Sequence, residues 1–187
     1  MTWIQTYTGR RFDLDNPDPA DVDRVDIAHA LSLICRFGGH TETHYSVAQH
    51  SLVVADFLST PTLGPHITPR LQLYAVLHDA AEAYIGDVTR PLKALLPEYA
   101  GIERNIKRAI AAHFGLFGID HYMVKRADSV ALYWERRDLL GEPSEPWQEE
   151  HLSALVPDET LTPMTAQEAE AAWLRRLEQL LAEEFAS

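Results

Sequence analysis

The chain has 187 residues, 46% of them hydrophobic and 24% charged, which is typical of a single globular domain and not of a disordered or fibrous protein. Its formal net charge of −12 argues against nucleic acid or an anionic membrane surface as a partner, because both are polyanions. No apolar run reaches the roughly 20 residues that span a bilayer, the first residues do not resemble a signal peptide, and the single cysteine, Cys35, excludes an intramolecular disulfide. These features predict a cytoplasmic protein.

The N-terminal segment alternates apolar and polar side chains around a Thr8–Gly9 turn, which predicts a short β-hairpin. No other convincing strand pattern follows, and the periodicity becomes helical. Asp26 is placed to cap a helix that carries Ile27, Leu31 and Ile34 on one side. The predicted class is therefore all-α, with a short hairpin at most.

The remaining helical patterns cover residues 46–58, 69–84, 98–114, 122–140 and 165–187. Ile102, Ile106 and Ile110 mark the buried side of the third of these helices, and a capping box of Thr165 and Glu168 opens the last. Residues 141–164 are rich in Pro and Glu, and we expect them to wrap the surface, anchored by Trp147 and Leu155. No internal repeat or domain boundary is evident, so residues 1–187 are predicted to form one domain.

An unusual polar stretch, LHDAAEAYIGD (Leu77 to Asp87), falls at the end of the helix predicted over residues 69–84. A buried acid is costly unless it is paired, hydrogen-bonded or bound to a metal. On an α-helix His78 and Glu82 share a face, and Asp79 points about 100° away from His78 around the helix axis. These residues can therefore present two ligands and a further carboxylate to one metal. The alternative is that His78 and Asp79 are a chance pair on a solvated helix face. The surrounding alanines speak against it, because they leave that helix little other polar surface.

Two further polar residues fall on apolar helix faces. His50 shares its face with Val47, Val54 and Leu58, and the helical neighbours of Asp128 are apolar as well. Taken alone, a histidine in such a place is more often a satisfied core residue. One shared cation explains all these residues together, and His50, His78, Asp79 and Asp128 would hold it with mixed nitrogen and oxygen ligands. Such a set accepts Mn, Fe, Co, Ni or Zn, with Mg as a further option, and leaves room for water and a phosphate oxygen.

The order His50, then His78–Asp79, then Asp128 resembles the H…HD…D signature of the HD-domain phosphohydrolases, whose fold is helical. Within that superfamily, HDAAEAYIGDVTRPLK (His78 to Lys93) is similar to the corresponding segment of the bacterial 5′-deoxynucleotidases. The stretch DIAHALSLICRFGGHTETHYSVAQHS also resembles short bacterial and phage HD proteins related to the phage dATP triphosphohydrolases. The resemblance covers residues 1 to about 140, and the C-terminal part adds nothing to it.

This resemblance implies one divalent metal held by the four ligands named above, with Glu82 as the catalytic group that moves a proton and Asp87 as the acceptor of a hydrogen bond from the sugar 3′-hydroxyl. Arg36 and Phe37 resemble the Arg-Trp pair of the nucleotidases, with Phe in place of Trp. Arg36 would clamp the phosphate bidentately as a catalytic and binding residue. Phe37 would stack on the base or sugar, although it can equally be a lid on the core.

Other cations near the motif are expected to contact phosphate. Lys93 and Arg90 follow the HD segment, and His40 and His44 lie in the loop after Phe37. The alternative for each of these cations is that it is simply exposed to solvent. For Glu82 the alternative is an ordinary surface position, and for Asp87 it is a helix cap.

The implied activity is hydrolysis of the 5′ phosphate ester of deoxynucleotides, most simply a 5′-deoxynucleotidase that releases phosphate from deoxynucleoside monophosphates. Three alternatives stay open: a triphosphohydrolase that releases tripolyphosphate, a cyclic-nucleotide phosphodiesterase with two metals that would need His113 and His121 as ligands, and a non-catalytic nucleotide-binding module. The family likeness and the apolar face of the last helix (Trp173, Leu177 and Leu180) also predict a homo-oligomer.

Overall fold

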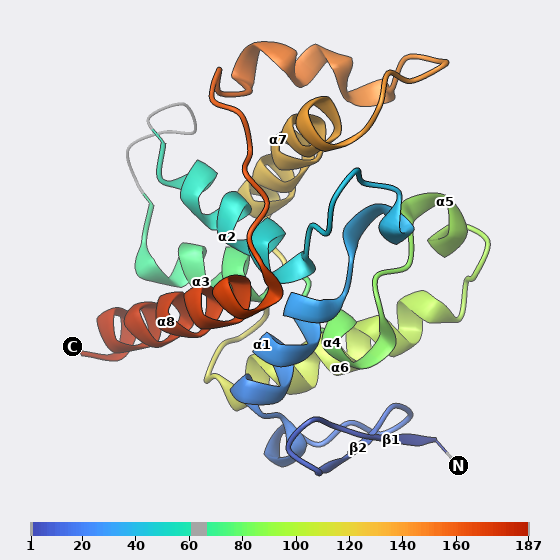
Figure 1. The fold of residues 1–187 in the computed structure, drawn as a ribbon. Helices are drawn as coiled ribbons and strands as arrows, with labels where there is room; N and C mark the ends of the chain where they lie inside the picture. Colours follow the sequence, from blue (N-terminus) through green and yellow to red (C-terminus); the bar gives the residue numbers. More distant parts are fainter. Residues whose placement is uncertain (1, 61–66, 187) are drawn as a thin grey trace.

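A computed structural model describes residues 2–60 and 67–186, without the side chains of 148–150 (Figure 1). The protein is all-α apart from one antiparallel hairpin, as the sequence predicts. The hairpin consists of β1 (Trp3–Gln5) and β2 (Arg11–Asp13). The helices are α1 (Arg24–Leu33), α2 (Val47–Leu58), α3 (Pro69–Leu77), α4 (Glu82–Ile85), α5 (Arg90–Lys93), α6 (Tyr99–His113), α7 (Tyr122–Leu139) and α8 (Ala166–Phe185), and the 3-10 turns are η1 (Pro19–Asp21), η2 (Arg36–Gly39) and η4 (Gln148–Leu155).

The junction between the hairpin and α1 differs from the prediction. Asp23, not Asp26, caps the helix, and its carboxylate accepts a hydrogen bond from the amide of Val25. Asp26 is buried in the first turn and accepts hydrogen bonds from the amide and hydroxyl of Thr8, at 2.6 and 2.9 Å. Asp26 therefore ties the turn of the hairpin to the helical body, a role that helical periodicity alone does not indicate.

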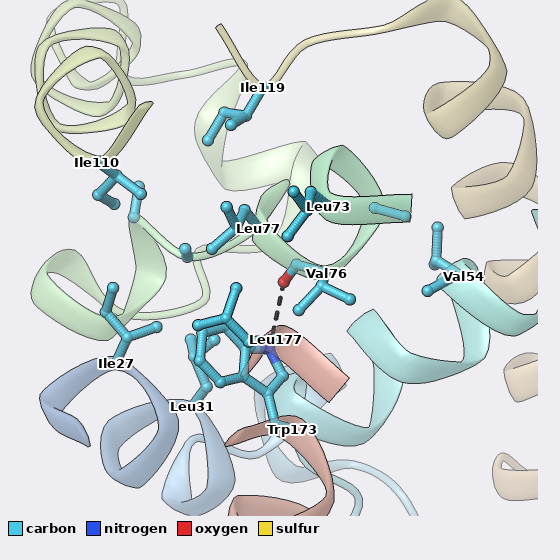
Figure 2. Close-up of a cluster of buried hydrophobic side chains, with 14 of the residues drawn as sticks. Ile27, Leu31, Val54, Leu73, Val76, Leu77, Ile110, Ile119, Trp173 and Leu177 are labelled. Carbon is cyan, nitrogen blue, oxygen red and sulfur yellow. Dashed lines mark hydrogen bonds between the residues drawn. The ribbon is translucent and has the colours of Figure 1, made fainter. Parts of the chain in front are cut away.

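The core lies where α8 crosses α1, α2 and α3 (Figure 1). Trp173 is 0% exposed, and its indole N–H donates to the carbonyl of Val76 at 3.2 Å (Figure 2). Leu177 and Leu180 are equally buried. The apolar face that suggested a homo-oligomer thus serves the protein's own core and is not available to a second copy.

One helix of the prediction is broken at the polar stretch. Instead of continuing from Pro69 to Tyr84, α3 ends at Leu77, and the amides of Ala80 and Glu82 bond to carbonyls three residues earlier. The ring of His78 donates from Nδ1 to the carbonyl of Ala75 at 2.7 Å. In a continuous helix that carbonyl would accept the amide of Asp79. The side chain of His78 thus helps to end α3 just before the candidate ligands His78 and Asp79.

Two further observations concern the helical segments. Ile102 is 39% exposed, contrary to the prediction, because the buried side of α6 begins only at Ile106. The capping box of Thr165 and Glu168 is confirmed at the start of α8. None of the helices in the described ranges combines the length and apolar character needed to cross a bilayer.

The segment 141–164 lies along α7, whose residues Trp134, Arg137 and Asp138 bond to its backbone, and Gln49 holds its end. Gln49, on α2, donates to the carbonyl of Thr162 and accepts from the amide of Met164, both at 2.8 Å. This pair of bonds fixes the end of the segment over α2.

Candidate metal centre

Three helical regions bring the four predicted ligands to one point. His50 comes from the middle of α2, His78 and Asp79 from the end of α3, and Asp128 from α7. The Nε2 atom of His50 lies 3.3 Å from an oxygen of Asp128 and 3.6 Å from an oxygen of Asp79. The Nε2 atom of His78 lies 3.0 Å from that same Asp79 oxygen. Ligand atoms of His50, His78 and Asp128 all lie within 4.8 Å of one another, so a single cation can reach them.

Both imidazoles are oriented as metal ligands would be. The Nδ1 atom of His78 donates to the carbonyl of Ala75, and that of His50 donates to Glu135 at 2.6 Å. Within the described residues, neither buried Nε2 atom has a hydrogen-bond partner. An unpaired buried nitrogen is costly, whereas histidines that bind metals usually donate their other ring N–H in this way. Two nitrogen and two oxygen donors therefore fit a divalent metal.

The electrostatics of the cluster favour a cation. Although burial and the charge of Arg36 oppose protonation, Glu135 and Asp128 raise the pKa of His50 to about 9. Burial works against ionisation of Asp128, yet the imidazole of His50 at 3.3 Å lowers its pKa to about 2. The imidazole of His78 likewise holds the pKa of buried Asp79 well below its ordinary value. Two ionised carboxylates thus face two imidazoles at a site that is only partly exposed.

A carboxylate that the sequence did not assign to the site lies directly behind it. Glu135, on α7, is 0% exposed. One of its oxygens accepts from His50 and from the hydroxyl of Tyr45 at 2.9 Å. The other accepts from Nε of Arg36 at 3.1 Å and forms an ion pair with Nη2 of the same guanidinium, also at 3.1 Å. Its position seven residues after Asp128 on the same helix could have indicated it.

Arg36 is not a free phosphate clamp. Only 8% of the residue is exposed, and two of its nitrogens contact Glu135. Its third nitrogen, Nη1, lies 3.8 Å from Asp79 and is the one directed toward the ligands. The guanidinium carbon of Arg36 lies 5.3 Å from the ring centre of Phe37. The backbone of Phe37 is left-handed, with a φ of 55°. That conformation is rare for a side chain of this size, so the surrounding structure has to impose it.

A cavity of about 610 Å³ adjoins the candidate metal centre. Trp147, from the segment that was expected only to wrap the surface, lines it and lies 6.5 Å from the ring of Phe37. The lining also includes most of the other predicted substrate contacts, namely Arg36, His40, Glu82, Asp87, Arg90 and Lys93. The C-terminal part of the chain, which adds nothing to the family resemblance, therefore contributes a residue to the cavity wall.

The histidines required by the two-metal alternative do not lie together. His113 donates to the carbonyl of Pro19 and borders a different hollow, whereas His121 lines the main cavity and accepts the amide of Met123 at the start of α7. His44 is exposed and is not part of the cavity wall.

Glu82 is a buried acid beside the cluster, with 2% of the residue exposed. Burial and the negative charges of Asp79 and Asp87 raise its pKa well above the ordinary value, against the opposing charge of Lys93 at 3.3 Å. Lys93 also contacts Glu103 at 3.2 Å. Glu82 therefore keeps its proton to a higher pH than a solvated glutamate does.

The cationic and acidic residues on the other side of the cavity are also engaged. Arg90 contacts Asp128 at 2.8 Å and so pairs with a candidate ligand. Burial raises the pKa of Asp87, with the charge of Arg36 opposing the shift. Arg36, Arg90 and Lys93, which were expected to bind phosphate, are thus already paired with acids.

Relatives of the chain are found among bacterial proteins. It is 39% identical to the uncharacterized protein YfdR of Escherichia coli over 139 residues, which is 74% of this chain and 73% of the relative. An uncharacterized protein of Rhodobacter capsulatus is 36% identical over 146 residues, covering 74% of each chain. No family model matches the sequence.

Proposed function

The chain belongs to the family of the Escherichia coli protein YfdR, and we propose that it is a metal-dependent phosphohydrolase that cleaves the 5′ phosphate ester of deoxynucleotides. One observation carries the proposal: two buried, unpaired Nε2 atoms meet two ionised carboxylates at the edge of a cavity. The resemblance of this residue pattern to the HD-domain phosphohydrolases, and to the 5′-deoxynucleotidases among them, supplies the reaction class.

Each residue of the site has a separate task in this reaction. His50, His78, Asp79 and Asp128 would hold the ion. A divalent metal would supply Lewis-acid polarisation of a phosphoryl oxygen and lower the pKa of water. Glu82, whose pKa burial raises, would donate a proton to the departing 5′ oxygen of the sugar.

Charge on the transferred phosphoryl group needs a fixed partner. Arg36 supplies it through Nη1, because its other nitrogens are held by Glu135 and cannot reorient. Lys93 is held between Glu82 and Glu103 and adds a second positive charge to the cavity wall. His40 lines the same wall and can donate to a phosphate oxygen.

The cavity is also suited to a nucleoside. Its volume of about 610 Å³ lies within the range of roughly 300–1,000 Å³ usual for small-molecule sites. Phe37 and Trp147 offer aromatic surface to a base, and Asp87 offers an acceptor to the 3′-hydroxyl. We place the enzyme in the cytoplasm and expect a homo-oligomer, the latter on family likeness alone.

A triphosphohydrolase is the second candidate. Lys107, which also contacts Glu103 and Asp120, and Lys125 line the same cavity as Lys93 and add positive charge that a monophosphate does not need. The triphosphate group of a nucleotide would use this additional positive charge.

A nucleotide screen tests the proposal. We expect purified protein with Mn²⁺, Co²⁺, Mg²⁺ or Zn²⁺ to hydrolyse deoxynucleotides and the chelator-stripped protein to be inactive. Release of inorganic phosphate from monophosphates supports the nucleotidase, whereas tripolyphosphate supports the second candidate. Tight nucleotide binding without turnover under any metal would refute both and leave a non-catalytic binding module.

A further inference from the structure

We propose that Glu135 is a positioning residue that keeps the metal centre competent in two ways, by orienting His50 and by holding Arg36 away from Asp79. The inference rests on the metal centre of the proposed function and deepens it. It concerns metal affinity and does not depend on which nucleotide is the substrate.

Glu135 is saturated by its neighbours and is not itself free to bind a metal. A carboxylate has about four lone-pair positions. His50 and Tyr45 occupy one oxygen of Glu135, and two nitrogens of Arg36 occupy the other. A fully buried carboxylate that accepts three hydrogen bonds and makes one further ion-pair contact is held in one orientation, so it can fix the groups that it touches.

The first effect passes through the imidazole of His50. Its Nδ1 atom donates to Glu135 at 2.6 Å, which leaves Nε2 directed at Asp128 and Asp79. Loss of such an outer partner typically weakens metal binding by about 10–100-fold, because the ring loses its fixed tautomer and orientation.

The second effect passes through Arg36. Its guanidinium lies between two carboxylates, with Glu135 at 3.1 Å and Asp79 at 3.8 Å. A buried cation that loses its partner pairs with the nearest remaining anion, since an uncompensated charge is costly there. Without the charge of Glu135, that anion is Asp79, a candidate ligand. Glu135 therefore prevents an internal ion pair from competing with the metal.

The two effects can be separated by measuring metal affinity in two backgrounds. The dissociation constant for Co²⁺ or Mn²⁺ is measured on chelator-stripped protein by competition with a chromophoric chelator. Glu135→Gln should weaken binding by about 10–100-fold in the otherwise unchanged protein. In an Arg36→Gln background the same change should cost less, because no guanidinium is left to pair with Asp79. Tyr45→Phe removes only one bond to Glu135 and should change the constant by less than about threefold.

Folding is followed by circular dichroism in every variant. If Glu135→Gln alone does not fold, the Arg36→Gln/Glu135→Gln pair, which leaves no unpaired buried charge, is compared with Arg36→Gln. An unchanged metal constant in both backgrounds would overturn the inference while leaving the proposed function intact. Equal losses in both backgrounds would overturn the role assigned to Arg36. Unmodified protein that binds no metal would refute the proposed function itself.

Discussion

Glu82→Gln should make the protein more stable and less active at the same time. The pKa of Glu82 is raised in the folded protein by burial and by Asp79 and Asp87. A carboxyl whose folded pKa lies above its unfolded value contributes stability that is complete at low pH and is lost as pH rises through the folded pKa. The side-chain amide introduced by Glu82→Gln cannot ionise, so the variant avoids this loss. Each unit of the pKa shift corresponds to about 1.4 kcal/mol of unfolding free energy.

The expected magnitudes follow from these energies. For each unit by which folding raises this pKa, the variant at pH 8 without metal should gain about 1.4 kcal/mol in its free energy of unfolding, or about 3–6 °C in melting temperature for a chain of this size. The difference should disappear toward pH 4. Turnover should fall by about 10²–10⁴, the usual effect of losing a positioned acid.

Thermal unfolding from pH 4 to 8 and steady-state assays on loaded enzyme measure both effects. Glu103→Gln is the matched control, since Glu103 is the other partner of Lys93 and has no assigned proton to transfer. A Glu82→Gln variant less stable than the parent at pH 8, or as active as it, would refute the reasoning.

Four further predictions concern the ligands, the sugar and the core. Asp79→Ala should abolish bound metal and activity together; metal retained at one equivalent after dialysis would remove Asp79 from the ligand set. Since a proton competes for the Nε2 atom of His50, whose pKa is about 9, metal affinity should rise about tenfold per pH unit between pH 6 and 9, and titrations showing no dependence would exclude this competition. Asp87→Asn should keep the metal but lose discrimination against 2′,3′-dideoxynucleotides, which the parent should reject by up to about 10⁴; equal parent rates on both sugars would remove Asp87 from sugar recognition. Trp173→Ala should lower the free energy of unfolding in urea by about 3–5 kcal/mol, and a loss below about 1 kcal/mol would contradict the packing described here.

The helices and the four candidate ligands could be predicted because both depend on local periodicity. His50 and Asp128 each interrupt an apolar face, and such an anomaly is visible in one dimension. Glu135 was missed because two arginines and Asp138 follow it, so its surroundings in the sequence resemble a solvated surface. Only the folded chain places Arg36, 99 positions away, against it.

Other differences have the same origin in contacts that periodicity does not encode. The break after α3 depends on a bond from the His78 ring to the backbone, and the burial of Trp173 depends on where α8 crosses α3. Trp147 lies in the irregular stretch between α7 and η4. Such a stretch has no helical or strand periodicity, so the sequence pattern could not place Trp147 in the cavity wall.

The distribution of the ligands over separate helices has a consequence for the order of folding. His50 and its partner Glu135 are 85 positions apart, and they meet only where α2 packs against α7. The ligand set is therefore completed late, after the helices have docked, unlike a zinc finger, whose short loop folds around its ion. Metal should leave the rate of refolding unchanged and slow unfolding, because it can bind only a chain that has already assembled.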